Sequence, residues 1–194
     1  MDRPDFTLYL GGTRSGKSAR AEARALELAR GPVLYVATAT AHDEAMSERI
    51  RRHRARRPSS WQTLECPRNL GQRLAAELPN LAASGYADRT GGTPTILIDC
   101  VTLWVSNILF SLPDPEALHP FETEVHREME ALLAVIRASG WRWLVVSGET
   151  GLGGIQPSAL GRTYADGLGL ANQLLAAEAR ECFLVVAGRL LRLE

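Results

Sequence analysis

The segment from Gly11 to Ser18, GGTRSGKS, combines glycines, a lysine and a serine in a spacing that suits the binding of phosphate groups. It matches the pattern G-x-x-x-x-G-K-[S/T] and lies between a run of strand-forming residues and an alanine-rich helical segment. Its glycines allow several backbone N–H groups to converge on phosphate oxygens, and the positive end of the following helix adds to the attraction. The segment therefore predicts a P-loop that binds a nucleoside triphosphate.

Two side chains of this segment have expected roles of their own. Lys17 would reach the outer phosphates, and Ser18 would bind Mg²⁺ through its hydroxyl. A site of this kind also needs a carboxylate near the magnesium, usually at the end of a neighbouring strand. Asp99, which closes the apolar run TILID, is the first candidate for this metal ligand, and Glu149, after WLVVSG, is the second. The alternative for each is an ordinary acidic residue between a strand and a loop.

A second informative segment is HDEAMSERIRRHRARRP, residues 42–58. It opens with acidic residues and ends with basic ones, which is the order that a helix dipole favours. Its arginines are compatible with a solvated helix face, the commonest role of such a run, or with a patch that contacts nucleic acid.

His53 adds a third interpretation of this basic helix. At helical spacing its neighbours are Arg49, Arg56 and Arg57. Nearby positive charges disfavour the imidazolium form, so the ring is expected to be neutral and nucleophilic. The same charges would gather the phosphates of a nucleotide and stabilise the charge that develops when its α-phosphorus is attacked. The segment therefore permits covalent nucleotidyl transfer through His53.

Alternating strand and helix patterns must position these residues. Short apolar runs predict strands at 6–10, 33–38, 95–99, 143–148 and 182–188, and the LLRLE segment (190–194) predicts an added edge strand or hairpin. Helical spacing of apolar residues predicts helices over 17–29, 43–56, 68–78, 120–138 and 158–178. Pro79 and residues 85–94 are expected to form an exposed connection before the third strand. The pattern indicates an α/β fold with a doubly wound, mainly parallel sheet.

Composition limits the function classes that remain. The 194 residues suit one domain, 1–194, and 22 basic residues balance 22 acidic ones, so no overall charge favours nucleic acid. The three cysteines have no metal-binding spacing. The N-terminus lacks a signal peptide, and no apolar run is long enough for a membrane span, so a cytoplasmic protein is expected. The Asn-Lys-x-Asp signature of guanine-specific switch GTPases does not occur.

Several blocks together resemble one known family over nearly the whole chain. They are GGTRSGKS, the helix pattern RI-x-x-H-R-x-x-RP at 49–58, ILIDCVTLWVSNILF, the loop GLGGIQP at 151–157 with the later NQ at 172–173, and the closing VVAGRLLRL. These blocks are similar to the bifunctional adenosylcobinamide kinase/adenosylcobinamide-phosphate guanylyltransferase family of cobalamin biosynthesis. The helix pattern and the GLGGIQP loop are more specific to this family than the P-loop is.

The resemblance implies a RecA-like P-loop NTPase fold and a two-step enzyme. The family phosphorylates the aminopropanol hydroxyl of adenosylcobinamide with ATP or GTP, and then transfers GMP from GTP to that phosphate through a guanylylated histidine, here His53. The implied partners are the corrinoid substrate, the nucleotide with Mg²⁺ and two further copies of the chain, because the family forms homotrimers with sites between subunits. The implied nucleotide contacts are Gly11, Gly12, Thr13, Arg14, Ser15, Gly16, Lys17, Ser18, Ala37, Thr38, Ala39, Arg54, Ala55, Arg56, Arg57, Glu65 and Asp99.

The chain departs from the family pattern at three positions. Arg52 stands where some members have the first of two adjacent histidines, which leaves His53 alone. Gly148 replaces an asparagine in the fourth-strand motif, and Ala165 replaces the inner arginine of R-x-F-R-D. The last two departures bear on corrinoid binding. Two other functions stay open at this point, a P-loop kinase without transferase activity and, less favoured, a RecA-like ATPase that binds nucleic acid.

Overall fold

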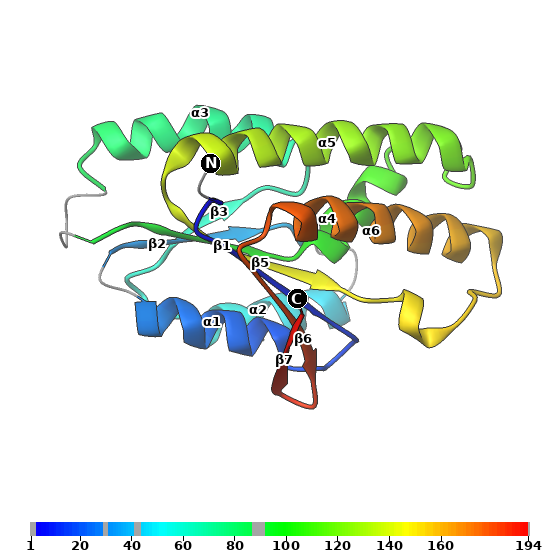
Figure 1. The fold of residues 1–194 in the computed structure, drawn as a ribbon, viewed down its shortest axis with the longest axis horizontal. Helices are drawn as coiled ribbons and strands as arrows, with labels where there is room; N and C mark the ends of the chain where they lie inside the picture. The colour runs from blue at the N-terminus through cyan, green and yellow to red at the C-terminus, as the bar shows by residue number, and fades with distance from the viewer. Residues whose placement is uncertain (1–2, 29–30, 41–43, 87–91, 194) are drawn as a thin grey trace.

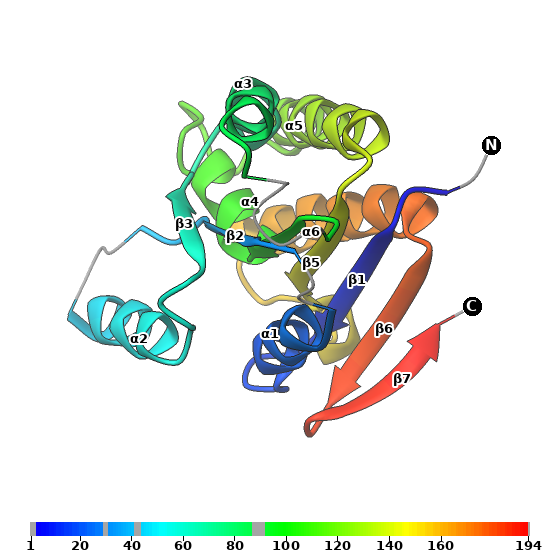
Figure 2. The ribbon, with the colours of Figure 1, turned by 90° about the vertical axis from the view of Figure 1, so that its left-hand side faces the viewer.

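The computed structural model describes residues 3–28, 31–40, 44–86 and 92–193, and it shows one sheet with helices on both faces (Figures 1 and 2). The strands are β1 (Phe6–Gly11), β2 (Val33–Ala37), β3 (Gln62–Glu65), β4 (Thr95–Asp99), β5 (Arg142–Gly148), β6 (Glu181–Val186) and β7 (Arg189–Leu193). The helices are α1 (Lys17–Leu28), α2 (Glu44–Ala55), α3 (Leu70–Ala83), α4 (Val101–Leu109), α5 (Leu118–Ser139) and α6 (Ala159–Glu178), with a short 3-10 helix η1 (Gly151–Gly153). Among the described residues, no helix has the length and apolarity that crossing a membrane requires.

The strand order confirms the expected mainly parallel, doubly wound sheet. The order is β3-β2-β4-β5-β1-β6-β7; every neighbouring pair is parallel except β6 and β7, which form an antiparallel hairpin. Two strands, β5 and β4, separate the P-loop strand β1 from β2, so the arrangement agrees with the RecA-like fold that was expected. Because the parallel strands end at the same edge, the segments that follow β1, β2, β4 and β5 gather there.

The parallel strands β1, β2, β4 and β5 are buried on both faces, as their continuous apolar runs predict. Ile96 and Ile98 of β4 belong to the larger core cluster, which is covered by α3, α4, α5 and α6. Leu97, between them, belongs to the smaller cluster on the opposite face, together with Ala21 and Ala25 of α1. Figure 2 shows the two layers, with α1 and α2 on one side of the sheet and the other four helices across from them.

Two elements were not predicted from the sequence. Strand β3 has three exposed residues of four, so it lacks the apolar run that marks a buried strand. Helix α4 begins at Val101, directly after β4, and its buried residues include Val101, Trp104, Val105 and Ile108. These positions have the i, i+3, i+4, i+7 spacing of a helix face, so the sequence contains a signal for α4 that the search for short apolar runs missed.

The expected break at Pro79 is wrong, because α3 continues through this residue to Ala83. Proline inside a helix removes one backbone hydrogen bond and costs about 3 kcal/mol. Burial of Leu78 and partial burial of Leu81 against the core offset this cost, since both side chains need the helical path to reach the core. Part of the expected connection, residues 87–91, lies outside the described residues.

Gly71 allows α3 to lie directly against α5. A Cβ atom at this position would come closer than 3.0 Å to the backbone of Ala131 and Leu132, which cannot move without displacing α5. We therefore expect Gly71→Ala to lower the free energy of unfolding by about 1–3 kcal/mol, the usual effect of overpacking.

Urea denaturation would measure this loss, with Gly169→Ala as the matched control. Gly169 lies in α6, and a Cβ there would meet nothing within 4 Å. The control should be neutral or more stable by up to about 1 kcal/mol, because alanine favours the helix. Equal effects of the two substitutions would contradict the close approach at Gly71.

Candidate nucleotide and histidine site

The predicted P-loop has the geometry of an anion-binding turn. It runs from buried Gly11, at the end of β1, to Lys17, where α1 begins. Gly16 has φ +95°, a conformation that other residues rarely adopt, and a Cβ there would also approach Gly188 at 3.2 Å. The ammonium group of Lys17 donates a hydrogen bond to the carbonyl oxygen of Gly12 at 3.1 Å. Lys17 therefore lies over the loop, where the phosphates of a nucleotide would bind.

The turn of the β6–β7 hairpin braces this loop from outside. The N–H of Gly188 donates to the carbonyl oxygen of Ser15 at 2.8 Å, and Arg20 Nε donates to the carbonyl oxygen of Gly188 at 2.6 Å. The hydroxyl of Ser15 is buried and has no hydrogen-bond partner among the described residues. Because a buried hydroxyl without a partner is costly, this group fits a loop that is completed by a ligand.

Asp99 is the carboxylate that the structure places beside the P-loop. Its side chain is 8% exposed, and its Oδ1 accepts a hydrogen bond from the Ser18 hydroxyl at 3.0 Å. Its Oδ2 accepts a hydrogen bond from the Tyr35 hydroxyl at 2.7 Å. The other candidate, Glu149, accepts from the N–H of Gly151 at 2.5 Å, so its carboxylate caps its own turn. Of the two acidic candidates, Asp99 is thus the one in contact with Ser18.

These contacts keep Asp99 ionised. Burial alone would raise the pKa of the Asp99 carboxyl, but the contacts with His53, Tyr35 and Ser18 outweigh it, and the pKa lies below its usual value. Burial, together with the charge of Asp99, raises the pKa of Tyr35, so the phenol stays protonated and keeps donating its hydrogen bond. A negative charge is therefore fixed at the end of β4, next to the P-loop serine.

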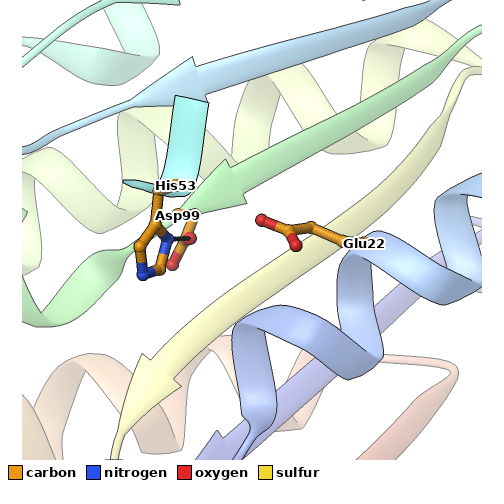
Figure 3. Close-up of side chains that lie close together, drawn as sticks. All are labelled: Glu22, His53 and Asp99. Atoms are coloured by element: carbon orange, nitrogen blue, oxygen red, sulfur yellow. Dashed lines mark ion pairs between the residues drawn. The ribbon is translucent and has the colours of Figure 1, made fainter. Parts of the chain in front are cut away.

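His53 lies against the same carboxylate (Figure 3). Its Nδ1 is 3.5 Å from Asp99 Oδ2, and its side chain is 25% exposed. Because Nδ1 faces an oxygen that can only accept, the ring is best satisfied with its proton on Nδ1, which leaves the lone pair on Nε2. Helical spacing indicated only arginines as neighbours of His53, whereas the structure adds the Asp99 carboxylate, which orients the ring.

The arginines after His53 hold the end of α2 to the sheet and to α1. The guanidinium of Arg57 lies over the Tyr35 ring, 3.7 Å from its centre, and its Nε donates to the carbonyl oxygen of His53 at 3.1 Å. Arg56 lies 4.0 Å from the carboxylate of Glu22 on α1. The two other residues predicted here, Arg54 and Ala55, are exposed. The side chain of Arg49 lies outside the described residues.

The remaining predicted contacts lie at neighbouring strand ends. Ala37 is the last residue of β2 and Ala39 lies just after it; both are half-buried, and Glu65 is exposed at the end of β3. Thr38 is fully buried, and its hydroxyl both donates to the carbonyl oxygen and accepts from the N–H of Cys100. The hydroxyl of Thr38 therefore ties the end of β2 to the turn after Asp99.

Sequence reasoning missed two residues of the cluster, Tyr35 and Glu22. Ligating atoms of Glu22, His53 and Asp99 all lie within 4.8 Å of one another. Glu22 lies four residues after Ser18, so both face the same side of α1. A charged residue between the buried alanines Ala21 and Ala25 was the available signal. For Tyr35 no signal distinguishes it from an ordinary core aromatic residue.

Comparisons with known proteins extend over nearly the same residues. The profile of the family described as "Cobinamide kinase / cobinamide phosphate guanyltransferase" matches residues 7–193. The chain is 41% identical to the bifunctional adenosylcobalamin biosynthesis protein CobP of Pseudomonas aeruginosa over 181 residues, which cover 93% of this chain and 92% of the relative. It is 35% identical to CobU of Escherichia coli over 187 residues and 36% identical to CobU of Salmonella typhimurium over 186 residues. Each of these two alignments covers 93% of this chain and 95% of the relative.

The low pKa of Asp99 predicts a pH dependence of stability. An aspartate in an unfolded chain has a pKa of about 3.9, so a lower folded-state value makes the ionised side chain stabilising above about pH 4. This contribution disappears as the pH falls through the folded-state pKa. We expect the wild type to be more stable than Asp99→Asn at pH 7, and the difference to shrink below about pH 4.

Urea unfolding of both proteins between about pH 3 and pH 7 would measure this difference. The control is Asp166→Asn, at an exposed position on α6, which should change the unfolding free energy little. A difference between wild type and Asp99→Asn that stays constant or grows toward acid would contradict the assignment.

Proposed function

The chain belongs to the cobinamide kinase / cobinamide phosphate guanyltransferase family, and we propose that it uses one nucleotide site for both reactions, with His53 as the residue that receives the guanylyl group. The observation that carries this proposal is the position of Asp99. Its Oδ1 contacts Ser18 of the P-loop, and its Oδ2 contacts His53. A nucleotide bound by the P-loop would therefore have its phosphates near His53.

The kinase reaction needs positioning and charge stabilisation from the protein. The hydroxyl oxygen of cobinamide attacks the γ-phosphorus of the nucleotide and forms an O–P bond, while the bond from that phosphorus to the bridging oxygen breaks. The nucleoside diphosphate leaves, and the hydroxyl proton passes to water. Backbone N–H groups of the P-loop and the ammonium of Lys17 bind the phosphate oxygens and stabilise their charge. The names of the relatives support a substrate with the adenosyl group, adenosylcobinamide, and either ATP or GTP is expected as the donor.

The site fits a magnesium ion. The Ser18 hydroxyl and the Asp99 carboxylate, 3.0 Å apart, are the hard oxygen ligands that Mg²⁺ prefers. These two residues would hold the ion, which would neutralise phosphate charge when bound. Asp99 Oδ2 would stay in contact with His53 and Tyr35, since Oδ1 is the oxygen that faces Ser18.

The guanylyl transfer proceeds in two displacements at one phosphorus. The Nε2 lone pair of His53 attacks the α-phosphorus of GTP, an N–P bond forms, and pyrophosphate leaves as its P–O bond breaks. An oxygen of cobinamide phosphate then attacks the same phosphorus, and the N–P bond electrons return to Nε2. Asp99 keeps the Nδ1 proton in place in both steps, so that Nε2 stays the reactive nitrogen. The guanidinium groups of Arg56 and Arg57 supply positive charge at this turn of α2.

The homotrimer and the cytoplasmic location stay predictions of the family resemblance.

Replacing the histidine tests the proposal directly. His53→Ala should abolish the protein–GMP adduct, because the imidazole that would form the N–P bond is removed, while the kinase rate with ATP should fall less than about threefold. Intact-protein mass spectrometry after incubation with GTP measures the adduct, which should be acid-labile and alkali-stable. His126→Ala, at an exposed position on α5, is the control and should still form it. If the wild-type protein phosphorylates cobinamide but forms no adduct, the proposed transfer through His53 is wrong and the protein is a kinase without this second activity.

Removing the serine hydroxyl tests the metal site. We expect Ser18→Ala to raise the Mg²⁺ concentration needed for half-maximal nucleotide binding by about tenfold, because one ligand is lost. Titration of a fluorescent ATP analogue at several Mg²⁺ concentrations provides the measurement. Thr123→Ala is the matched control, since its hydroxyl bonds to the His119 carbonyl oxygen within α5. An unchanged Mg²⁺ requirement in Ser18→Ala would remove Ser18 from the metal site.

A further inference from the structure

Glu22 is a buried carboxylate that the reactions above do not use. It extends from α1 toward His53 and Asp99 (Figure 3), and its side chain is 13% exposed. Its Oε1 is buried and has no hydrogen-bond partner among the described residues. Removing an ionised carboxylate from water costs free energy unless nearby positive charge compensates it. The positive groups near Glu22 therefore indicate why a carboxylate occupies this position.

The positive groups that face Glu22 come from the end of α2 and the residues just after it. Arg56 is 4.0 Å away, and the His53 ring lies in the cluster that spans 4.8 Å. Burial, the largest cause, raises the pKa of Glu22; the charge of Arg56 lowers it, and the neighbouring charge of Asp99 raises it.

Helix α2 depends on such contacts because it contributes little to the core. None of its described side chains is buried, whereas α1, α3, α4, α5 and α6 all have buried residues. Figure 2 shows α2 at the periphery of the molecule, beside α1. The described contacts that tie its end to the body are His53 with Asp99, Arg57 with Tyr35 and Thr63, and Arg56 with Glu22. Glu22 is the residue of α1 that takes part in these contacts.

We propose that Glu22 is a positioning residue for the guanylylation of His53: its charge holds the C-terminal turn of α2 against α1, so that the imidazole stays beside Asp99. This inference rests on the proposed role of His53. Glu22 acts through Arg56 and the ring, and it does not touch the reacting phosphorus. The kinase reaction does not use His53, so only the transfer half should depend on Glu22.

The experiment compares the full chain with three variants, Glu22→Gln, Glu22→Asp and Glu27→Gln. Single-turnover adduct formation with GTP and steady-state kinase activity with ATP are measured for each. Glu22→Gln keeps the shape of the side chain and should slow adduct formation by about tenfold to a hundredfold, the effect of a small misplacement of the nucleophile. Its kinase rate and its KM for ATP should stay within about twofold.

The other two variants separate charge from structure. Glu22→Asp keeps the charge on a shorter side chain and should recover part of the lost rate. Glu27→Gln is the matched control on the same helix: Glu27 is exposed and pairs with Arg24 at 3.2 Å, so both rates should be unchanged. Should Glu22→Gln fail to fold, the Glu22→Asp variant decides, with an intermediate adduct rate and wild-type kinase activity as the expected result.

NMR of the histidine ring nitrogens without nucleotide provides an independent readout. The His53 signals should change in Glu22→Gln and stay as in wild type in Glu27→Gln. If the wild type forms no adduct, the proposed function fails, but these signals still report whether Glu22 positions the ring. Wild-type adduct rates in Glu22→Gln, an equal loss of both activities, or no recovery in Glu22→Asp would each overturn the inference.

Discussion

The two oxygens of the Asp99 carboxylate determine how this site is assembled. One accepts from the P-loop serine and the other faces the tyrosine of β2 and the histidine of α2, so a single rigid group joins three separate elements. The carboxylate can do this because β4 is a central strand, buried on both faces, whose end is fixed by its pairing with β2 and β5. Its ionised form is favoured inside the protein because three donors surround it. The carboxylate that joins the P-loop serine to His53 is therefore positioned by the sheet.

His53, the proposed nucleophile, lies on α2, the one of the six helices that has no buried residue among those described. The arginines near His53 give a physical reason, since a guanidinium group cannot be buried without a large desolvation cost. The helix is instead held by charged and aromatic contacts, including the guanidinium of Arg57 over the Tyr35 ring. Such contacts are weaker than core packing, so they orient the helix without making it part of the core. The larger core cluster, with α5 and α6 packed on the sheet, lies on the opposite face.

The fold could be predicted from the sequence wherever the signal was local. The P-loop, its flanking strand and helix and the end of β4 at Asp99 all follow from patterns of fewer than about 20 residues. The contact between His53 and Asp99 could not be predicted in this way, because it depends on how α2 crosses the strand ends. For the same reason the helix spacing around His53 indicated only arginines, while the groups that orient the ring come from β4 and α1. Strand β3 was missed because an exposed edge strand of four residues has no distinctive composition.

The brace between the P-loop and the β6–β7 turn has a consequence for synthesis of the chain. Arg20 and Gly188 are 168 positions apart, so the loop emerges from the ribosome long before the turn that supports it. A partly made chain therefore has the phosphate-binding motif without its outer support, and β1 still lacks one of its two neighbouring strands. Since a ligand favours the state that binds it, nucleotide would stabilise the complete fold more than the partly made chain if the outer support helps the loop to bind. Synthesis of the final hairpin would then be the step that completes the phosphate site.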